Sequence, residues 1–208
     1  MTVHPFGDRA FLIELEQRID PSIIDTARAI ADAWEERRLG EAIVAYASVV
    51  LAFDPAHTPW ADAMAAATAL AASPPTAAAP TAGRLIEIPT VYDGPDLAET
   101  ADRSGLSIAE VIALHSGREY RAFFLGFMPG LAYCGMLDPL IVAPRLPAPR
   151  PRVPAGSVAI ANGQTIVYPA DSPGGWRLIG RTELRTFDPA REPVALIGVG
   201  DRLRFVPR

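Results

Sequence analysis

The chain has 208 residues, half of them hydrophobic, and a formal net charge of −5 at pH 7. This length suggests one large or two small domains with enough apolar residues for a core. The negative charge argues against general binding of nucleic acid. No apolar run approaches the roughly 20 residues that a membrane span needs, so we expect no contact with a membrane.

All 19 basic residues are arginine. A P-loop, which requires lysine, and a Schiff-base lysine are therefore excluded. Cys134 is the single cysteine, so no disulfide can form within the chain. Together with a start that lacks a signal-peptide pattern, this makes the cytoplasm the expected compartment. The three histidines, His4, His57 and His115, are far apart in sequence, and we expect no metal site.

The first part of the chain alternates between strand and helix patterns. Residues 9–15 alternate apolar and polar side chains, which predicts a strand. Asp20 and Pro21 predict the start of a helix with one apolar face, because an N-cap acceptor precedes proline at the first helical position. Two more strands and an alanine-rich helix are predicted at 41–47, 48–54 and 58–70. This order predicts a small two-layer α/β sandwich domain over residues 1–72.

Residues 73–83 are rich in alanine and proline and lack periodicity, which predicts a linker. The second domain, 84–208, opens with the strand pattern RLIEIPTVY. Two short helices are predicted there from capping-box patterns, one pairing Asp96 with Glu99 and the other Ser107 with Glu110. Further strands are predicted at 118–127, 194–198 and 201–206. Many short strands with few helices predict a barrel or closed sheet.

Proline and glycine punctuate residues 126–182 every few positions. Between them lie the apolar runs SVAIA, QTIVY and WRLIG, which predict strands joined by rigid loops. Rigid loops on a β scaffold are the expected place for a binding site.

Three arginines, Arg145, Arg150 and Arg152, lie in the proline-spaced run PRLPAPRPR. Proline keeps the backbone extended and holds these side chains apart. Planar guanidinium groups match carboxylates and phosphates, so the three are candidates for binding an anionic substrate or intermediate. The alternative is that they bridge loop carbonyls and acidic residues of the fold.

Other polar and aromatic residues beside the turns are further candidates for substrate binding. Ser157, Gln164 and Tyr168 lie there, and the amide of Gln164 suits a lactam or ureido group. Trp176 either stacks on a planar ring or closes the end of a barrel. His115 either caps a helix or acts in acid–base chemistry. The sequence shows no carboxylate dyad, triad or nucleotide loop, so catalytic residues stay unassigned and a partner is expected to complete the site.

The segments GFMPGLAYCGML, PRLPAPRPRVPAGSVAIANGQTIVYP and SPGGWRLIGRT resemble the signature segments of the allophanate hydrolase subunit 1 family. That family includes the B subunit of bacterial 5-oxoprolinase and KipI-type kinase inhibitors. The resemblance implies an α+β protein with a cyclophilin-like β-barrel after the small first domain.

The resemblance also implies a function shared with other chains. The expected activity is that of the B subunit of an ATP-dependent 5-oxoprolinase, which opens 5-oxoproline to glutamate. Two partner proteins are implied. One resembles the enzyme's C subunit or allophanate hydrolase subunit 2, and the other resembles its A subunit. ATP would be used through the complex, and this chain would be inactive alone. A KipI-type inhibitor of a sensor histidine kinase and a subunit of the allophanate hydrolase or urea carboxylase type are the alternatives.

Overall fold

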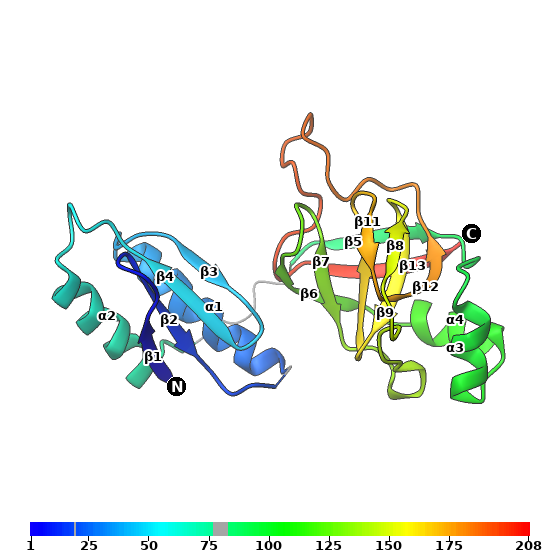
Figure 1. Cartoon of the computed structure of the whole chain (residues 1–208), viewed down its shortest axis with the longest axis horizontal. Coiled ribbons are helices and arrows are strands. Elements are labelled where there is room, and N and C mark those ends of the chain that lie inside the picture. The colour runs from blue at the N-terminus through cyan, green and yellow to red at the C-terminus, as the bar shows by residue number, and fades with distance from the viewer. Residues whose placement is uncertain (19, 77–82) are drawn as a thin grey trace. The chain divides into compact units, whose positions relative to one another are not determined.

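The computed structural model describes residues 1–18, 20–76 and 83–208, and the chain divides into two compact units, Met1–Thr81 and Ala82–Arg208 (Figure 1). The predicted linker, 73–83, stays a prediction, because its residues 77–82 lie outside the described part of the chain. Within the described residues, no helix is long and apolar enough to cross a membrane.

The first unit is an antiparallel sheet with two helices packed against one of its faces (Figure 1). The strands occur in the order β1-β2-β4-β3. The elements are β1 (Thr2–Pro5), β2 (Ala10–Glu14), α1 (Pro21–Glu36), β3 (Ala42–Val44), β4 (Ser48–Ala52) and α2 (Trp60–Ala72). This confirms the predicted two-layer arrangement and adds β1, whose sequence TVHP carries no alternating apolar pattern.

Local signals explain where α1 begins and which face it buries. The Asp20 side chain accepts a hydrogen bond from the backbone N–H of Ser22, and Pro21 is the first helical residue. Ile30 and Trp34 are fully buried against the sheet. The indole N–H of Trp34 also donates to the Ala52 carbonyl at 2.8 Å. Burial of such side chains stabilises the unit by about 1.5–3 kcal/mol each.

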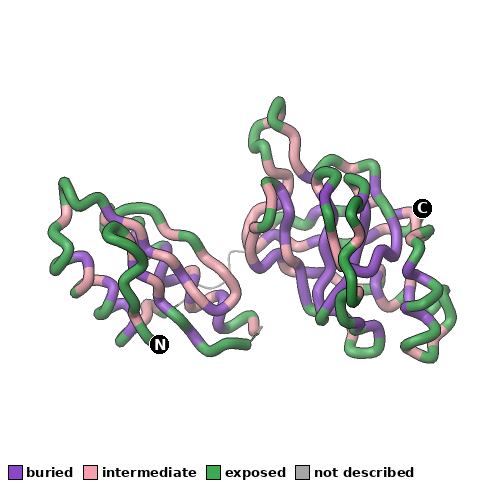
Figure 2. The backbone as a smooth tube through the Cα atoms, viewed as in Figure 1, coloured by how far each residue is buried: buried purple, intermediate pink, exposed green. Residues whose placement is uncertain are grey.

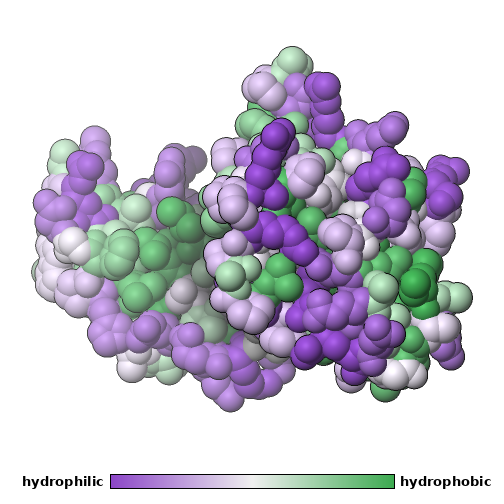
Figure 3. All heavy atoms as spheres, turned by 45° about the vertical axis from the view of Figure 1, so that its right-hand side comes forward, coloured by the Kyte–Doolittle hydropathy of each residue, from purple (hydrophilic) through white to green (hydrophobic). Residues whose placement is uncertain are grey.

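The opposite face of this sheet carries apolar side chains that the described residues of its own unit leave uncovered. Leu12 pairs with Val50, and Val50 pairs with Ile43, so the three lie side by side across β2, β4 and β3. Ile43 is 66% exposed. Figure 3 shows hydrophobic residues gathered on the visible side of the first unit.

The second unit is built on a nearly closed barrel (Figure 1). Its strands occur in the order β12-β9-β10-β7-β6-β13-β5. They are β5 (Leu85–Thr90), β6 (Tyr120–Leu125), β7 (Ala132–Gly135), β9 (Ser157–Ala161), β10 (Gln164–Val167), β12 (Arg177–Arg181) and β13 (Arg202–Pro207). Val91 and Arg181 exchange two backbone hydrogen bonds, of 2.9 and 2.8 Å, which bring the two ends of the sheet together. The predicted α+β fold with a barrel in its second part is therefore confirmed.

Every residue of β9 and β10 is buried, and Figure 2 shows further buried residues along this unit. Val158, Ile160 and Val167 belong to the main core of the barrel. The alternate positions, including Ala159 and Ile166, belong to a second cluster on the other face. That second cluster also contains Val153 of β8 (Arg150–Val153), which pairs with β11 (Ser172–Gly174) in a separate two-stranded sheet.

One of the two predicted capping boxes is wrong. Ser107 and Glu110 form the predicted capping box at the start of α4 (Ile108–Ser116). The other predicted box does not form, because α3 (Leu97–Ser104) has no side-chain cap. Asp96 and Glu99, which were expected to cap it, instead pair with Arg150 and Arg177. These tertiary ion pairs take the place of the local hydrogen bonds.

The strand predicted at 194–198 is also absent. Only an isolated bridge between Phe187 and Ala195 forms there. The Arg191 side chain donates to the carbonyl groups of Arg185 and Val194, and the Val194 carbonyl also accepts from the backbone N–H of Asp188 at 2.9 Å. The remaining short helical element, η1, spans Pro139–Ile141.

Candidate functional site

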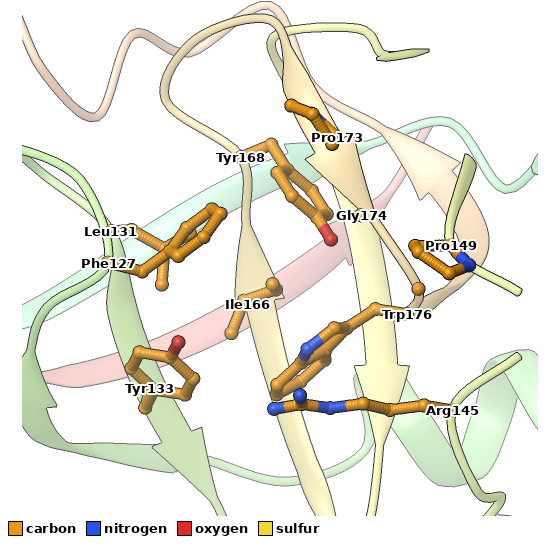
Figure 4. A pocket seen from close by; sticks show the side chains of 11 residues that line it. Phe127, Leu131, Tyr133, Arg145, Pro149, Ile166, Tyr168, Pro173, Gly174 and Trp176 are labelled. Carbon is orange, nitrogen blue, oxygen red and sulfur yellow. The ribbon is translucent and has the colours of Figure 1, made fainter. Parts of the chain in front are cut away.

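A cavity of about 270 Å³ lies on the outer face of β7 and β10, beside β11. It is lined by aromatic and aliphatic side chains, proline, glycine and one arginine: Phe127, Leu131, Tyr133, Arg145, Pro149, Ile166, Tyr168, Pro173, Gly174, Gly175 and Trp176. Figure 4 shows Phe127, Leu131 and Tyr133 on one side, Tyr168 and Trp176 on the other, and Ile166 between them. Because Phe127 and Arg145 are both exposed, the cavity opens to solvent beside them.

Strand alternation places the floor of this cavity. Ile166 and Tyr168 are two residues apart and point to the same face of the sheet. Thr165, which precedes Ile166, points to the opposite face, where its hydroxyl contacts His115. Residues 165–168 therefore contribute alternately to the barrel core and to the cavity.

Aromatic packing fixes the walls. The ring of Tyr133 stacks on Phe124 with centroids 4.4 Å apart, and it meets the Trp176 ring edge-on at 5.8 Å. Trp176 is only 5% exposed, so it both fills space against the barrel and presents part of its ring to the cavity. The guanidinium carbon of Arg145 lies 5.6 Å from the centre of the Trp176 ring, which is a cation–π contact (Figure 4).

Two backbone features shape the rim. A Cβ atom at Gly174 would lie 2.3 Å from the Tyr168 hydroxyl oxygen, so only glycine allows the tyrosine to pack there. Phe127 has a φ of 70°, which is unusual for a bulky residue, and its side chain is 68% exposed at the cavity edge. Conformations of this kind are concentrated at binding and active sites.

The structure separates the three arginines of the proline-rich run. Arg150 donates to Asp96 at 2.5 Å and to the carbonyl of Trp176 at 3.4 Å. Arg152 donates two hydrogen bonds, of 2.8 and 2.6 Å, to one oxygen of Asp171. Arg145 alone of the three lines the cavity, and among the described residues no carboxylate pairs with it.

Three other predicted site residues lie outside this cavity. The Ser157 hydroxyl donates to the Pro154 carbonyl at 2.8 Å, and Ser157 lines a different depression with Asp93 and Arg181. Gln164 is 5% exposed, and its side-chain nitrogen has no hydrogen-bond partner among the described residues. His115 is fully buried on the opposite face of the sheet. Their roles in substrate binding stay predictions.

His115 belongs to a buried polar cluster. Its Nδ1 lies 2.7 Å from the Tyr92 hydroxyl and its Nε2 lies 3.0 Å from the Thr165 hydroxyl. Burial, with a smaller contribution from the positive charge of Arg118, lowers the pKa of His115 to about 3. The imidazole is therefore neutral at physiological pH.

The cavity combines an apolar and aromatic lining with one arginine. Its lining contains no Asp, Glu, His or Cys. Burial raises the pKa of Tyr133 and of Tyr168, so both phenols stay protonated at neutral pH. Across the described residues, no group of three His, Cys, Asp or Glu side chains could hold a metal ion.

The substrate-binding candidates predicted from the sequence include three of the cavity residues, Arg145, Tyr168 and Trp176. Phe127 and Ile166 were not among those candidates. The alternation within QTIVY is a signal that could have paired Ile166 with Tyr168. The position of Phe127 depends on a loop conformation that no local pattern encodes.

Comparison with known proteins identifies the family of this chain. Residues 1–197 match the model of the family described as carboxyltransferase domain, subdomain C and D, and the chain belongs to that family. It is also similar to the B subunit of 5-oxoprolinase from Escherichia coli O157:H7, at 53% identity over 128 residues. That match covers 60% of this chain and 59% of the relative, so the chain spans less than two thirds of the curated relative. The resemblance inferred from the signature segments is confirmed.

Two solved structures share the fold. The structure of TTHA0988 is 38% identical with a TM-score of 0.84, over 96% of this chain and 40% of that chain. The urea carboxylase of Kluyveromyces lactis is 18% identical with a TM-score of 0.76, over 99% of this chain and 21% of that one. The second likeness concerns the fold alone. In both proteins, the region that matches this chain is part of a longer polypeptide.

Proposed function

We propose that the chain is the B component of an ATP-dependent 5-oxoprolinase. In that reaction one water adds across the C–N bond of the lactam, which yields the amine and the second carboxylate of glutamate. The hydrolysis of ATP consumes a second water. A partner resembling the C subunit of that enzyme and a third protein resembling its A subunit would complete the complex in the cytoplasm.

The observation that carries this proposal is the incomplete chemistry of the cavity. Its lining offers one cation and an apolar surface, with no general acid or base that titrates near neutral pH and no nucleophilic carboxylate or thiol. The similarity to a protein named as the B subunit of 5-oxoprolinase supports the assignment to that reaction. The structure of TTHA0988, in which the matching region is 40% of a longer polypeptide, supports a need for further protein around this fold.

ATP is proposed to be used through the complex. The sequence has no lysine and hence no P-loop, so a nucleotide site within this chain would need another architecture.

The test is reconstitution with the proposed partner subunits. Glutamate release from 5-oxoproline is measured with ATP, without ATP, and with each subunit omitted in turn. The proposal expects release only from the full set with ATP. Release that persists when this chain is omitted, or turnover by this chain alone, would contradict it.

One observation favours a second candidate function, a KipI-type inhibitor of a sensor histidine kinase. Phe127 is 68% exposed, and an exposed aromatic side chain suits a contact with another protein. Inhibition of kinase autophosphorylation by the wild-type chain, lost in Phe127→Ser, would support that alternative. The reconstitution assay separates the two functions.

A further inference from the structure

Arg145 differs from the other arginines of its run in being electrostatically available. Its neighbours Arg150 and Arg152 are neutralised by Asp96 and Asp171. Arg145 is held over the Trp176 ring, and within the described residues no acidic side chain competes for it. A guanidinium group placed in this way gains strongly from a carboxylate, because it can donate two parallel hydrogen bonds.

The remaining surface of the cavity suits a small ring. The space of about 270 Å³ is bounded by Tyr133, Ile166 and Trp176, which offer apolar and aromatic contact. It lies just below the volumes of roughly 300–1,000 Å³ typical of sites for larger ligands. A ring of five or six atoms bearing one carboxylate matches both the size and the single cation.

We propose that this cavity binds a small cyclic monocarboxylate, with its carboxylate on Arg145 and its ring between Tyr133, Ile166 and Trp176. The inference rests on the proposed function, in which the ligand is a lactam carboxylate. It assigns substrate binding and bond breaking to different subunits. This chain binds and orients the substrate through its carboxylate. The lactam amide, for which the lining holds no acid, base or nucleophile, is left to groups of the partner subunits.

Arg150 contacts the segment that carries the indole ring. It pairs with Asp96 and donates a hydrogen bond to the Trp176 carbonyl. The ring in turn contacts Arg145. These contacts connect Asp96 to Arg145 without neutralising the anion-binding group.

Binding to the 208-residue chain tests the inference directly. Ligand-observed NMR titrations compare 5-oxoproline with 2-pyrrolidinone, which has the same lactam ring without the carboxylate. We expect 5-oxoproline to bind and 2-pyrrolidinone to bind at least about tenfold more weakly, because a hydrogen bond to a charged group contributes about 1.5–3 kcal/mol and each 1.4 kcal/mol is a factor of ten. Arg145→Gln should weaken 5-oxoproline binding by about 10- to 100-fold on the same reasoning.

The matched control is Arg204→Gln. Arg204 lies on β13 and pairs with Glu119, away from the cavity, so this variant removes the same charge from the same unit. Affinity in the control should stay at the wild-type value. Equal weakening in both variants would show a general charge effect and refute the inference, and an absence of 5-oxoproline binding to the wild-type chain would overturn it as well.

Kinetics of the reconstituted complex separate this inference from the proposed function. Arg145→Gln should raise KM for 5-oxoproline while kcat changes little, because the residue binds the part of the substrate that does not react. An active complex with an unchanged KM in Arg145→Gln refutes the inference and leaves the function standing. Carboxylate binding through Arg145 in a set of subunits that forms no glutamate refutes the function and leaves the binding site standing.

Discussion

The stability of the second unit should depend on pH through one histidine. His115 is fully buried, with its ring nitrogens occupied by the hydroxyl groups of Tyr92 and Thr165. Burial lowers the pKa of His115 to about 3 in the folded protein, whereas an exposed histidine has a pKa of about 6.5. The other two histidines, His4 and His57, lie in the first unit.

The sign of the effect follows from proton binding. Below about pH 6.5 the unfolded chain takes up a proton at this histidine, and the folded chain does not until about pH 3. Stability contributed by neutral His115 is therefore fully present above about pH 6.5 and is lost as the pH falls. The slope approaches about 1.4 kcal/mol per pH unit, so the unit loses about 1.5 kcal/mol between about pH 6.5 and pH 5.

The assay is urea unfolding of the full chain at several pH values from about 5 to 7, a range that spans the pKa of an exposed histidine. The NMR signals of β9 are followed so that only the second unit is observed.

His115→Gln keeps a neutral hydrogen-bonding side chain and removes the titration. Its free energy of unfolding should be lower at neutral pH but nearly independent of pH in this range. His57→Gln, in the first unit, should leave the wild-type dependence unchanged. Equal slopes for wild type and His115→Gln would show that the imidazole is solvated, and the reasoning would fail.

Three further outcomes are expected. Asp96→Ala should lower the free energy of unfolding of the second unit by about 3–5 kcal/mol in urea titrations, because it leaves Arg150 unpaired at a largely buried site. The control, Asp171→Ala, breaks an exposed ion pair with Arg152 and should lower the free energy of unfolding far less. Equal losses in the two variants would contradict this expectation. Burial opposes ionisation of Asp201, but hydrogen bonds from Arg84 and Gly198 hold its pKa below the ordinary value. The stability that the Asp201 carboxylate contributes is therefore lost only as the pH falls below about 4. In acid titrations, the stability of Asp201→Asn should fall less steeply with pH than that of the wild type. Burial raises the pKa of the Cys134 thiol, so iodoacetamide should label it only after unfolding, and fast labelling of the folded chain would refute its burial.

Local patterns in the sequence were sufficient for most of the elements. The capped start of α1 at Asp20 and the capping box of α4 depend on residues two or three positions apart, and both form. The apolar runs that became β9, β10 and β12 are bounded by glycine and proline, whose backbone restrictions act wherever they occur. The resemblance carried by the signature segments indicated the family directly.

The candidate site was predictable only in part. Arg145, Tyr168 and Trp176 were singled out for their chemistry, and they line the cavity. Arg150 had the same local context as Arg145, yet its partner Asp96 is 54 positions away. No pattern within PRLPAPRPR distinguishes the two.

The sequence by itself indicated most of the elements and the side chains able to bind an anion. Tertiary structure decided which of them are available. It buried His115, paired Arg150 and Arg152 with carboxylates, and left Arg145 over Trp176. The physical reason is that charge availability and burial are properties of neighbours in space, and in this barrel the deciding neighbours come from strands and loops far apart along the chain.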